Sequence, residues 1–305
     1  MAKISEAEVM ADHGIDDVFV AYPLVTAAKM ERALRLSERI RLCVGVDSEA
    51  GARNMEEAAA RRGTTLRVRL EIDCGLRRTG VPYEQAVKLA QLIHGLPHLD
   101  LDGIYTFRGN LLDGKPTLDL RSAGHEEGRL MVALAEQIRA QGVPVREVSV
   151  GSTPTALYAG EVEGVTEVRP GTYIFYDRMQ AKLGVCSLDD CAASVLATVV
   201  SRPSDTLAII DGGSKTFATD VQPDKEPLNL SGFGYIPAAP EAMLERLTEE
   251  HGMIRAQAGD GLTIGSRVRI VPNHICSTVN LHNRVYLHEN GRYRAIAVAA
   301  RGMLE

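Results

Sequence analysis

A histidine and a cysteine two residues apart, His274 and Cys276, are the residues of this chain whose types and spacing most directly suggest chemistry. They lie in the segment Pro272-Asn273-His274-Ile275-Cys276, which we expect to be an extended strand. Side chains at positions i and i+2 of a strand share one face, so the two could bind one zinc ion together. Two protein ligands leave room for water or substrate, as in catalytic sites. A buried thiol beside a hydrogen-bonded core histidine is the alternative interpretation.

The overall composition is that of an ordinary globular protein. The chain has 305 residues, of which 45% are hydrophobic and 24% charged, enough for a large core and two domains. Its formal net charge of -6 argues against a nucleic-acid surface. The sequence shows neither a long apolar run nor a signal segment, so we expect a cytoplasmic location. An odd number of irregularly spaced cysteines predicts free thiols: Cys43, Cys74, Cys186, Cys191 and Cys276.

The chain divides into two parts with different predicted secondary structure. Strands expected at 17–22, 40–46, 65–73, 101–107, 145–150 and 166–169 alternate with helices expected at 25–39, 48–62, 83–94 and 126–141. This βα repetition lacks a GxGxxG fingerprint, which favours a TIM-type barrel over a dinucleotide-binding sheet. Strands dominate later, at 194–201, 206–211, 266–271, 284–287 and 293–299, with one helix at 240–251. The sequence therefore predicts an α/β barrel domain over residues 1–183 and a mainly antiparallel β domain over residues 184–305.

Small residues and hydroxyls end two of the expected barrel strands. Gly151, Ser152 and Thr153 offer backbone N–H groups and hydroxyls that suit a phosphate anion, although a capped strand-to-helix turn would use the same residues. Gly171 and Thr172 form a second such turn. Because TIM-barrel sites lie at the carboxyl ends of the strands, two turns of this kind predict a phosphate site at one rim.

Four segments in this order, 67–80, 151–153, 167–171 and 272–276, resemble the successive signatures of the fold-type III pyridoxal-phosphate (PLP) enzymes. The resemblance is to the D-threonine aldolase and D-serine dehydratase branch, relatives of alanine racemase, and it runs over nearly the whole chain. The His-x-Cys segment distinguishes this branch from alanine racemase itself. The resemblance implies a (partial) TIM-type PLP-binding barrel followed by a β domain that carries a metal-ligand pair.

The resemblance also implies roles for individual residues. It implies that Arg78 hydrogen-bonds the phenolic oxygen of the cofactor, and that His274 and Cys276 bind Zn²⁺ or another divalent metal. Arg108 ends a barrel strand at the same rim and is a candidate for contacting the substrate carboxylate. The remaining implied cofactor-binding residues are those of the phosphate cradle, one weaker aromatic candidate and one arginine that in alanine racemase approaches the pyridine nitrogen: Gly151, Ser152, Thr153, Gly171, Thr172, Tyr173 and Arg169.

The function implied by the resemblance is that of a PLP- and metal-dependent lyase acting on D-3-hydroxy amino acids. Either retro-aldol cleavage or elimination of the hydroxyl fits, and the absence of the aldolases' His-x-Asp pair favours the dehydratase type. A catalytically impaired fragment or a non-catalytic PLP-binding homologue is one alternative. An amino-acid racemase is another, less consistent with a metal pair. Relatives usually form dimers, so a homodimer is expected if the full barrel is present.

One family signature has no match in these 305 residues. The family anchors its cofactor through a Schiff-base lysine in a segment resembling Pro-His-x-Lys-Thr-His-Lys, and neither Lys3 nor Lys215 matches that position. We expect about two strands of an eight-stranded barrel to be missing with it. Without the lysine, this chain should bind PLP weakly and turn over substrate poorly.

Overall fold

The computed structural model describes residues 1–305 and divides into two compact units, residues 1–170 with 303–305 and residues 171–302. The division falls between Pro170 and Gly171, earlier than the boundary expected at residue 183. Hydrogen bonds explain the difference, because the segment after Gly171 is tied to the second unit. The Met179 N–H donates to the Asn273 carbonyl at 3.1 Å, and the Asp177 carboxylate accepts the Ile275 N–H at 2.9 Å.

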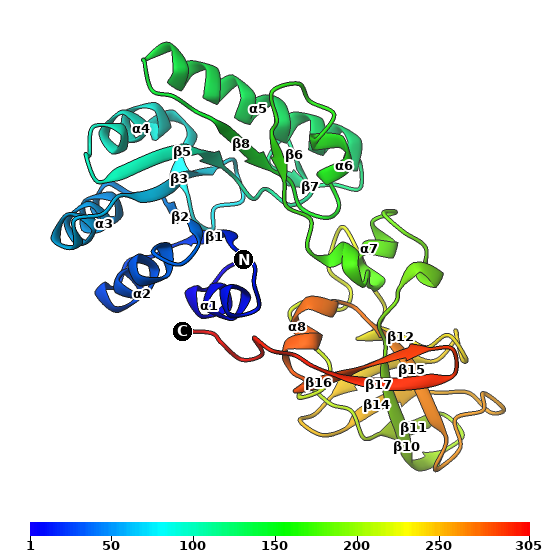
Figure 1. Ribbon diagram of the computed structural model, residues 1–305. Coiled ribbons are helices and arrows are strands. Elements are labelled where there is room, and N and C mark those ends of the chain that lie inside the picture. The colour runs from blue at the N-terminus through cyan, green and yellow to red at the C-terminus, as the bar shows by residue number, and fades with distance from the viewer. The chain divides into compact units, whose positions relative to one another are not determined.

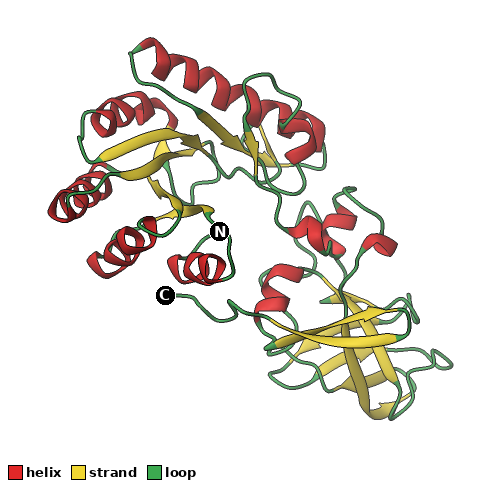
Figure 2. Cartoon of the chain, viewed as in Figure 1, coloured by secondary structure: helices red, strands yellow, loops and turns green.

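The first unit is built on an open parallel sheet (Figures 1 and 2). The strand order is β1-β2-β3-β5-β8-β9, every pairing is parallel, and β1 and β9 form the two ends of the sheet. This half-barrel confirms the expected partial TIM-type architecture. Its strands are β1 (Asp17–Pro23), β2 (Arg41–Val46), β3 (Leu66–Asp73), β4 (Val81–Pro82, paired with β3), β5 (Leu99–Tyr105), β8 (Glu147–Val150) and β9 (Glu167–Val168), with a small hairpin of β6 (Leu111–Leu112) and β7 (Lys115–Pro116).

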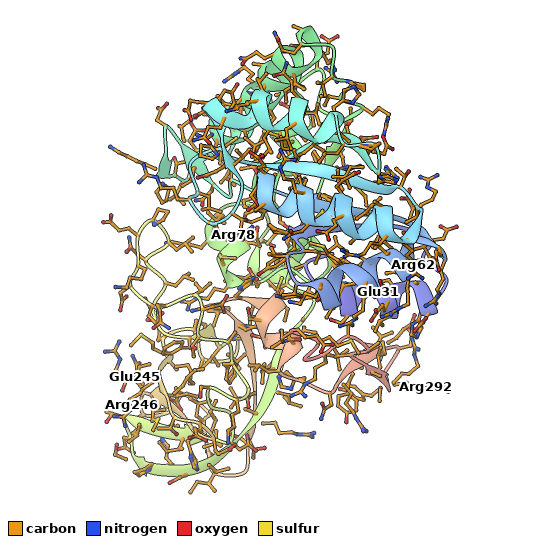
Figure 3. The ribbon with its side chains drawn as sticks, turned by 90° about the vertical axis from the view of Figure 1, so that its left-hand side faces the viewer. Glu31, Arg62, Arg78, Glu245, Arg246 and Arg292 are labelled. Carbon is orange, nitrogen blue, oxygen red and sulfur yellow. The ribbon has the colours of Figure 1, made fainter.

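Helices follow the strands and pack against the sheet from its outer side (Figure 1). They are α1 (Ile4–Asp12), α2 (Ala27–Ser37), α3 (Glu49–Arg62), η1 (Tyr83–Gln85), α4 (Ala86–His94), α5 (Leu120–Ala140) and the short α6 (Ala156–Ala159). Local sequence fixes their ends. At α3, the Ser48 hydroxyl accepts the Gly51 N–H at 3.2 Å, and Gly63 ends the helix in the left-handed conformation with φ 66°. Glu31 of α2 and Arg62 of α3 form an ion pair at 2.6 Å (Figure 3).

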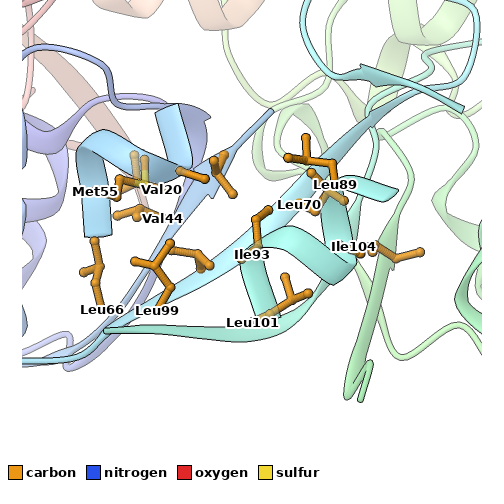
Figure 4. Packing of buried hydrophobic residues seen from close by; sticks show 14 of the residues in the cluster. Val20, Val44, Met55, Leu66, Leu70, Leu89, Ile93, Leu99, Leu101 and Ile104 are labelled. Atoms are coloured by element: carbon orange, nitrogen blue, oxygen red, sulfur yellow. The ribbon is translucent and has the colours of Figure 1, made fainter. Parts of the chain in front are cut away.

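One face of this parallel sheet is apolar and the other carries charged side chains. On β3, Leu66 and Leu70 point outward into an apolar cluster with side chains of the neighbouring strands and helices (Figure 4). The alternate positions, Arg67 and Arg69, point to the inner face, where both guanidinium groups donate to the buried carboxylate of Asp102 at 3.0 Å. Parallel strands are usually apolar on both sides, so this half-barrel is unusual in closing its inner face with paired charges.

The second unit is mainly antiparallel, as expected. Its six-stranded sheet has the order β12-β15-β10-β11-β14-β13 and encloses a second apolar core around the fully buried Phe217. The elements are η2 (Thr172–Ile174), α7 (Arg178–Lys182), η3 (Leu188–Asp190), β10 (Val195–Ser204), β11 (Leu207–Ile210), β12 (Gly234–Tyr235), β13 (Met243–Leu247), β14 (Gly252–Arg255), β15 (Arg267–Pro272), α8 (Ile275–Asn280), β16 (Arg284–Glu289) and β17 (Arg292–Ala297). The last two strands form a separate two-stranded hairpin.

Two local predictions are wrong. The segment 240–251 is not helical: it contains β13, which forms a hairpin with β14 and buries Leu244. Its residues are good helix formers, but strand pairing overrides this weak preference. The His-x-Cys segment is not extended either, because β15 ends at Pro272 and His274 is the N-cap of α8. Among all the helices, none is both long and apolar enough to cross a bilayer.

Candidate active site

The carboxyl end of β3 holds a buried carboxylate, Glu71, inside the half-barrel. Its oxygens accept the Tyr105 hydroxyl at 3.0 Å and the Thr79 hydroxyl at 2.7 Å. Burial raises the pKa of Glu71, and these two hydrogen bonds offset the rise only in part. The phenol fits beneath Gly45, where an added Cβ would lie 2.1 Å from the tyrosine oxygen. Burial also raises the pKa of Tyr105 well above its usual range, so the phenol stays protonated and acts as a donor.

Arg169 crosses the inner face beside this pair. Its guanidinium donates to the Ser149 hydroxyl and the Thr106 carbonyl, and it lies 5.5 Å from the centre of the Tyr105 ring. Burial lowers the pKa of Arg169, while the carboxylate of Glu167 acts in the opposite direction. The two hydrogen bonds hold the side chain inside the half-barrel, and the resemblance to alanine racemase placed a cofactor contact at this residue.

Arg78 and Arg108 lie in different environments. Arg78 is exposed, and its guanidinium stacks 4.7 Å from the centre of the Phe107 ring (Figure 3). Arg108 is buried and donates to the Cys74 carbonyl at 2.9 Å and to the Glu126 carboxylate at 2.5 Å. The structure thus holds Arg108 in a buried ion pair rather than at an exposed rim. One of its nitrogens, Nη1, is buried without a protein partner.

The turn at Gly151 is supported by a carboxylate that the sequence interpretation missed. Glu127, on the buried face of α5, accepts the Gly151 N–H and the Thr155 hydroxyl, each at 3.2 Å. The Ser152 hydroxyl is 3.1 Å from that of Thr155. Gly151 adopts φ 86°, a left-handed conformation that favours glycine. The Gly151 N–H is therefore engaged by protein, so it is not available to a phosphate at this turn.

In the second unit, the side chains of His274 and Cys276 come together although their backbone is not extended. His274 is held by the Asp220 carboxylate, and the Thr172 hydroxyl lies 3.5 Å from the Cys276 sulfur. Burial disfavours a charged imidazole, but hydrogen bonds to Asp220 and Cys276 outweigh it and raise the pKa of His274 to about 10. Burial raises the pKa of Cys276, and the hydrogen bond from His274 outweighs that effect and lowers it.

The remaining predicted residues of this unit lie in the first turn after the boundary. Gly171 precedes the 3-10 helix η2, and a Cβ built on it would meet no atom within 4 Å. Tyr173 is 53% exposed and does not pack into the core, so its ring is accessible to a ligand.

The donor set suits an open metal site better than a structural one. No set of three or more His, Cys, Asp and Glu side chains is arranged to hold a metal. A thiol and an imidazole at the start of one helix supply two ligands, and one imidazole nitrogen is engaged by a carboxylate, as in many zinc sites. That carboxylate, Asp220, could not be predicted from local patterns, because it lies 54 positions away from His274 in an irregular segment.

Comparisons with known proteins agree with this architecture. Residues 1–179 match the family described as alanine racemase, N-terminal domain, and residues 192–288 match a putative serine dehydratase domain. The D-threo-3-hydroxyaspartate dehydratase of Delftia sp. is 32% identical over 91% of this chain and 77% of its own length. The crystal structure of D-threonine aldolase from Filomicrobium marinum superposes with a TM-score of 0.86 at 26% identity, over 100% of this chain and 82% of that one.

Two mutant structures of a D-threo-3-hydroxyaspartate dehydratase are also similar. One replaces a cysteine by alanine and is described as a metal-free form; its TM-score is 0.85 at 31% identity, over 96% of this chain and 82% of that one. Another replaces a histidine two residues earlier in that chain, the spacing of His274 and Cys276. The chain therefore belongs to the alanine racemase N-terminal domain family of fold-type III PLP enzymes, in the form that also carries a serine dehydratase domain.

Proposed function

We propose that this protein is a PLP- and metal-dependent lyase acting on D-3-hydroxy amino acids, and that it eliminates the β-hydroxyl. The observation that carries the proposal is the placement of His274 and Cys276 together at the start of α8, with Asp220 holding the imidazole and the Thr172 hydroxyl beside the thiol. A histidine and a cysteine at this spacing were replaced in the mutants of the similar dehydratase, and the cysteine mutant is described as metal-free. Zinc is the metal we propose, because a thiolate ligand favours a borderline-soft ion.

When bound, PLP supplies an electron sink at the substrate Cα, and a divalent metal supplies a Lewis acid for the β-hydroxyl. His274 and Cys276 would hold the metal. In the first unit, two arginines would bind the anionic cofactor. Arg169 is held inside the half-barrel by its hydrogen bonds, and Arg78 is exposed. The Tyr105 phenol, kept protonated by burial and by Glu71, stays a hydrogen-bond donor in the same inner face.

Retro-aldol cleavage is the second candidate, because an aldolase structure superposes over the whole chain. Both reactions need the β-hydroxyl to be polarised, and they differ in whether the Cα proton or the hydroxyl proton is removed. Their products separate them: dehydration gives a keto acid and ammonia, whereas cleavage gives glycine and an aldehyde. We propose a homodimer as the working assembly, to be measured by light scattering.

The test measures the metal content of the purified protein and identifies the products of its reaction. We expect about one zinc per chain, lost in Cys276→Ala and retained in Cys191→Ala, a control cysteine in the same unit. D-serine, D-threonine and D-threo-3-hydroxyaspartate are assayed beside their L enantiomers. A metal-free protein whose activity is unchanged by Cys276→Ala would refute the metal site. Racemised substrate would indicate a racemase, and bound PLP without turnover would indicate a non-catalytic homologue.

A further inference from the structure

A carboxylate far along the chain holds the imidazole of His274. Asp220 lies in an irregular segment of the second unit, and its Oδ2 is 2.5 Å from His274 Nδ1. The same oxygen accepts the Ser277 hydroxyl at 3.2 Å. Asp220 therefore contacts two side chains at the start of α8, one on each side of Cys276.

The backbone that carries these ligands is fixed independently. The buried Asp177 accepts the Ile275 N–H at 2.9 Å and also caps α7 through the Gln180 N–H at 2.9 Å. The Thr278 hydroxyl donates to the His274 carbonyl at 2.7 Å. With the main chain held by these contacts, the remaining freedom at His274 is rotation of its side chain. Asp220 is the residue that restrains this rotation.

The contact also decides which ring nitrogen can bind a metal. An ionised carboxylate can only accept a hydrogen bond, so the neutral imidazole carries its hydrogen on Nδ1 and keeps a lone pair on Nε2. A neighbouring carboxylate also makes the ring a stronger ligand. Without Asp220, the ring could adopt the other tautomer or turn away from the cysteine.

We propose that Asp220 is a positioning residue that fixes the tautomer and direction of His274, so that Nε2 and the Cys276 thiolate bind one divalent metal ion. This inference rests on the metal site of the proposed function. Asp220 itself does not reach the metal, because its carboxylate is engaged by the opposite side of the imidazole.

The experiment measures metal affinity directly, without turnover. Zn²⁺ binding to the natural gene product is measured by competition with a chromophoric chelator, and Co²⁺ substitution reports the ligand field and the thiolate charge-transfer band. Asp220→Asn should weaken Zn²⁺ binding by about 10–100-fold and shift the Co²⁺ spectrum. Asp220→Glu, which keeps the charge, should recover part of the affinity. The matched control is Ser277→Ala, which removes the other contact of Asp220 and should stay within about threefold of the wild type.

The outcomes separate this inference from the metal site itself. If the wild type binds no metal, or if Cys276→Ala binds it as well as the wild type, the proposed metal site fails and the role of Asp220 fails with it. If Cys276→Ala abolishes binding while Asp220→Asn leaves affinity and spectrum unchanged, only the positioning role is refuted. The Asp220 side chain is 45% exposed in an irregular segment, so these variants should fold, and Asp220→Glu provides a second measurement with the carboxylate retained.

Discussion

Replacing Asp102 by asparagine tests whether paired charges stabilise the inner face of the half-barrel. The carboxylate is 3% exposed and accepts hydrogen bonds from Arg67 and Arg69 at 3.0 Å and from Arg146 at 3.1 Å. Asparagine has nearly the same shape but no charge. The change would leave the buried guanidinium of Arg69 with Glu167 as its remaining partner.

The loss of stability expected for Asp102→Asn depends on how deeply its ion pairs are buried. Removing one partner of a buried ion pair costs about 3–5 kcal/mol of unfolding free energy, because the other charge stays buried. Asparagine can still accept a hydrogen bond, so we expect the lower end, about 3 kcal/mol. The matched control is Asp17→Asn, which breaks the Arg41–Asp17 pair at 2.5 Å between neighbouring strands and a longer contact with Arg67 at 3.9 Å. The Arg41 and Asp17 side chains are 72% and 55% exposed, so this loss should be about 0–1 kcal/mol.

The difference in stability between the wild type and Asp102→Asn should decrease as the pH falls. Burial raises the pKa of Asp102, but the hydrogen bonds from its three arginines outweigh burial and lower it. A folded-state pKa below the unfolded value of about 3.9 means that the stabilisation is complete above that pH. It is lost as the pH falls through the folded-state pKa. The wild type and Asp102→Asn should therefore differ most at neutral pH and converge in acid.

Hydrogen exchange measured by mass spectrometry on peptides that cover β3 and β5 gives the local opening free energy without assuming that both units unfold together. Faster exchange in Asp102→Asn than in Asp17→Asn is the expected result. The reasoning would be wrong if Asp102→Asn stayed within about 1 kcal/mol of the wild type at pH 7, or if the exposed pair proved equally important.

Further substitutions test the close packing at Gly45 and the buried carboxylate of Glu127. Gly45→Ala places a Cβ 2.1 Å from the Tyr105 oxygen and should lower the free energy of unfolding by about 1–3 kcal/mol. The control is Gly171→Ala, which should be nearly neutral because a Cβ there meets no atom within 4 Å. Thermal unfolding followed by circular dichroism compares the two variants. Burial raises the pKa of Glu127, so its contribution to stability is largest in acid and falls as the pH rises through that raised value. Glu127→Gln keeps an acceptor for the Gly151 N–H and should flatten the fall of Tm with pH above the ordinary pKa of a glutamate. An unchanged slope would contradict this explanation.

Periodicity predicted most of the first unit because each strand has a strictly alternating or apolar outer face. The strand expected at 17–22 is β1 at Asp17–Pro23, and the helix expected at 48–62 is α3 at Glu49–Arg62. The segment 240–251 was mistaken because its composition favours a helix, while its strand conformation comes from pairing with β14. Such pairing depends on residues that a local window does not contain.

In the candidate site too, local sequence patterns identified some residues, whereas partners far away in the sequence could not be predicted. Residue types and spacing were enough to select His274 and Cys276. They were not enough to show that a helix begins there, because the N–H of its first residue, Ile275, is accepted by Asp177, 98 positions away. Asp220 and Glu127 were missed for the same reason: an acidic residue acquires its role from a partner that only the fold brings near.

The alternating faces of β3 also constrain how this sequence can diverge. At Leu66 and Leu70, volume is the property under selection, so one aliphatic residue can replace another singly. At Arg67 and Arg69, charge must balance with Asp102 and Glu167, so a change at one position favours a compensating change on another strand. Along a single strand, independent substitution and correlated substitution should therefore alternate residue by residue, and the inner face should diverge in groups rather than one site at a time.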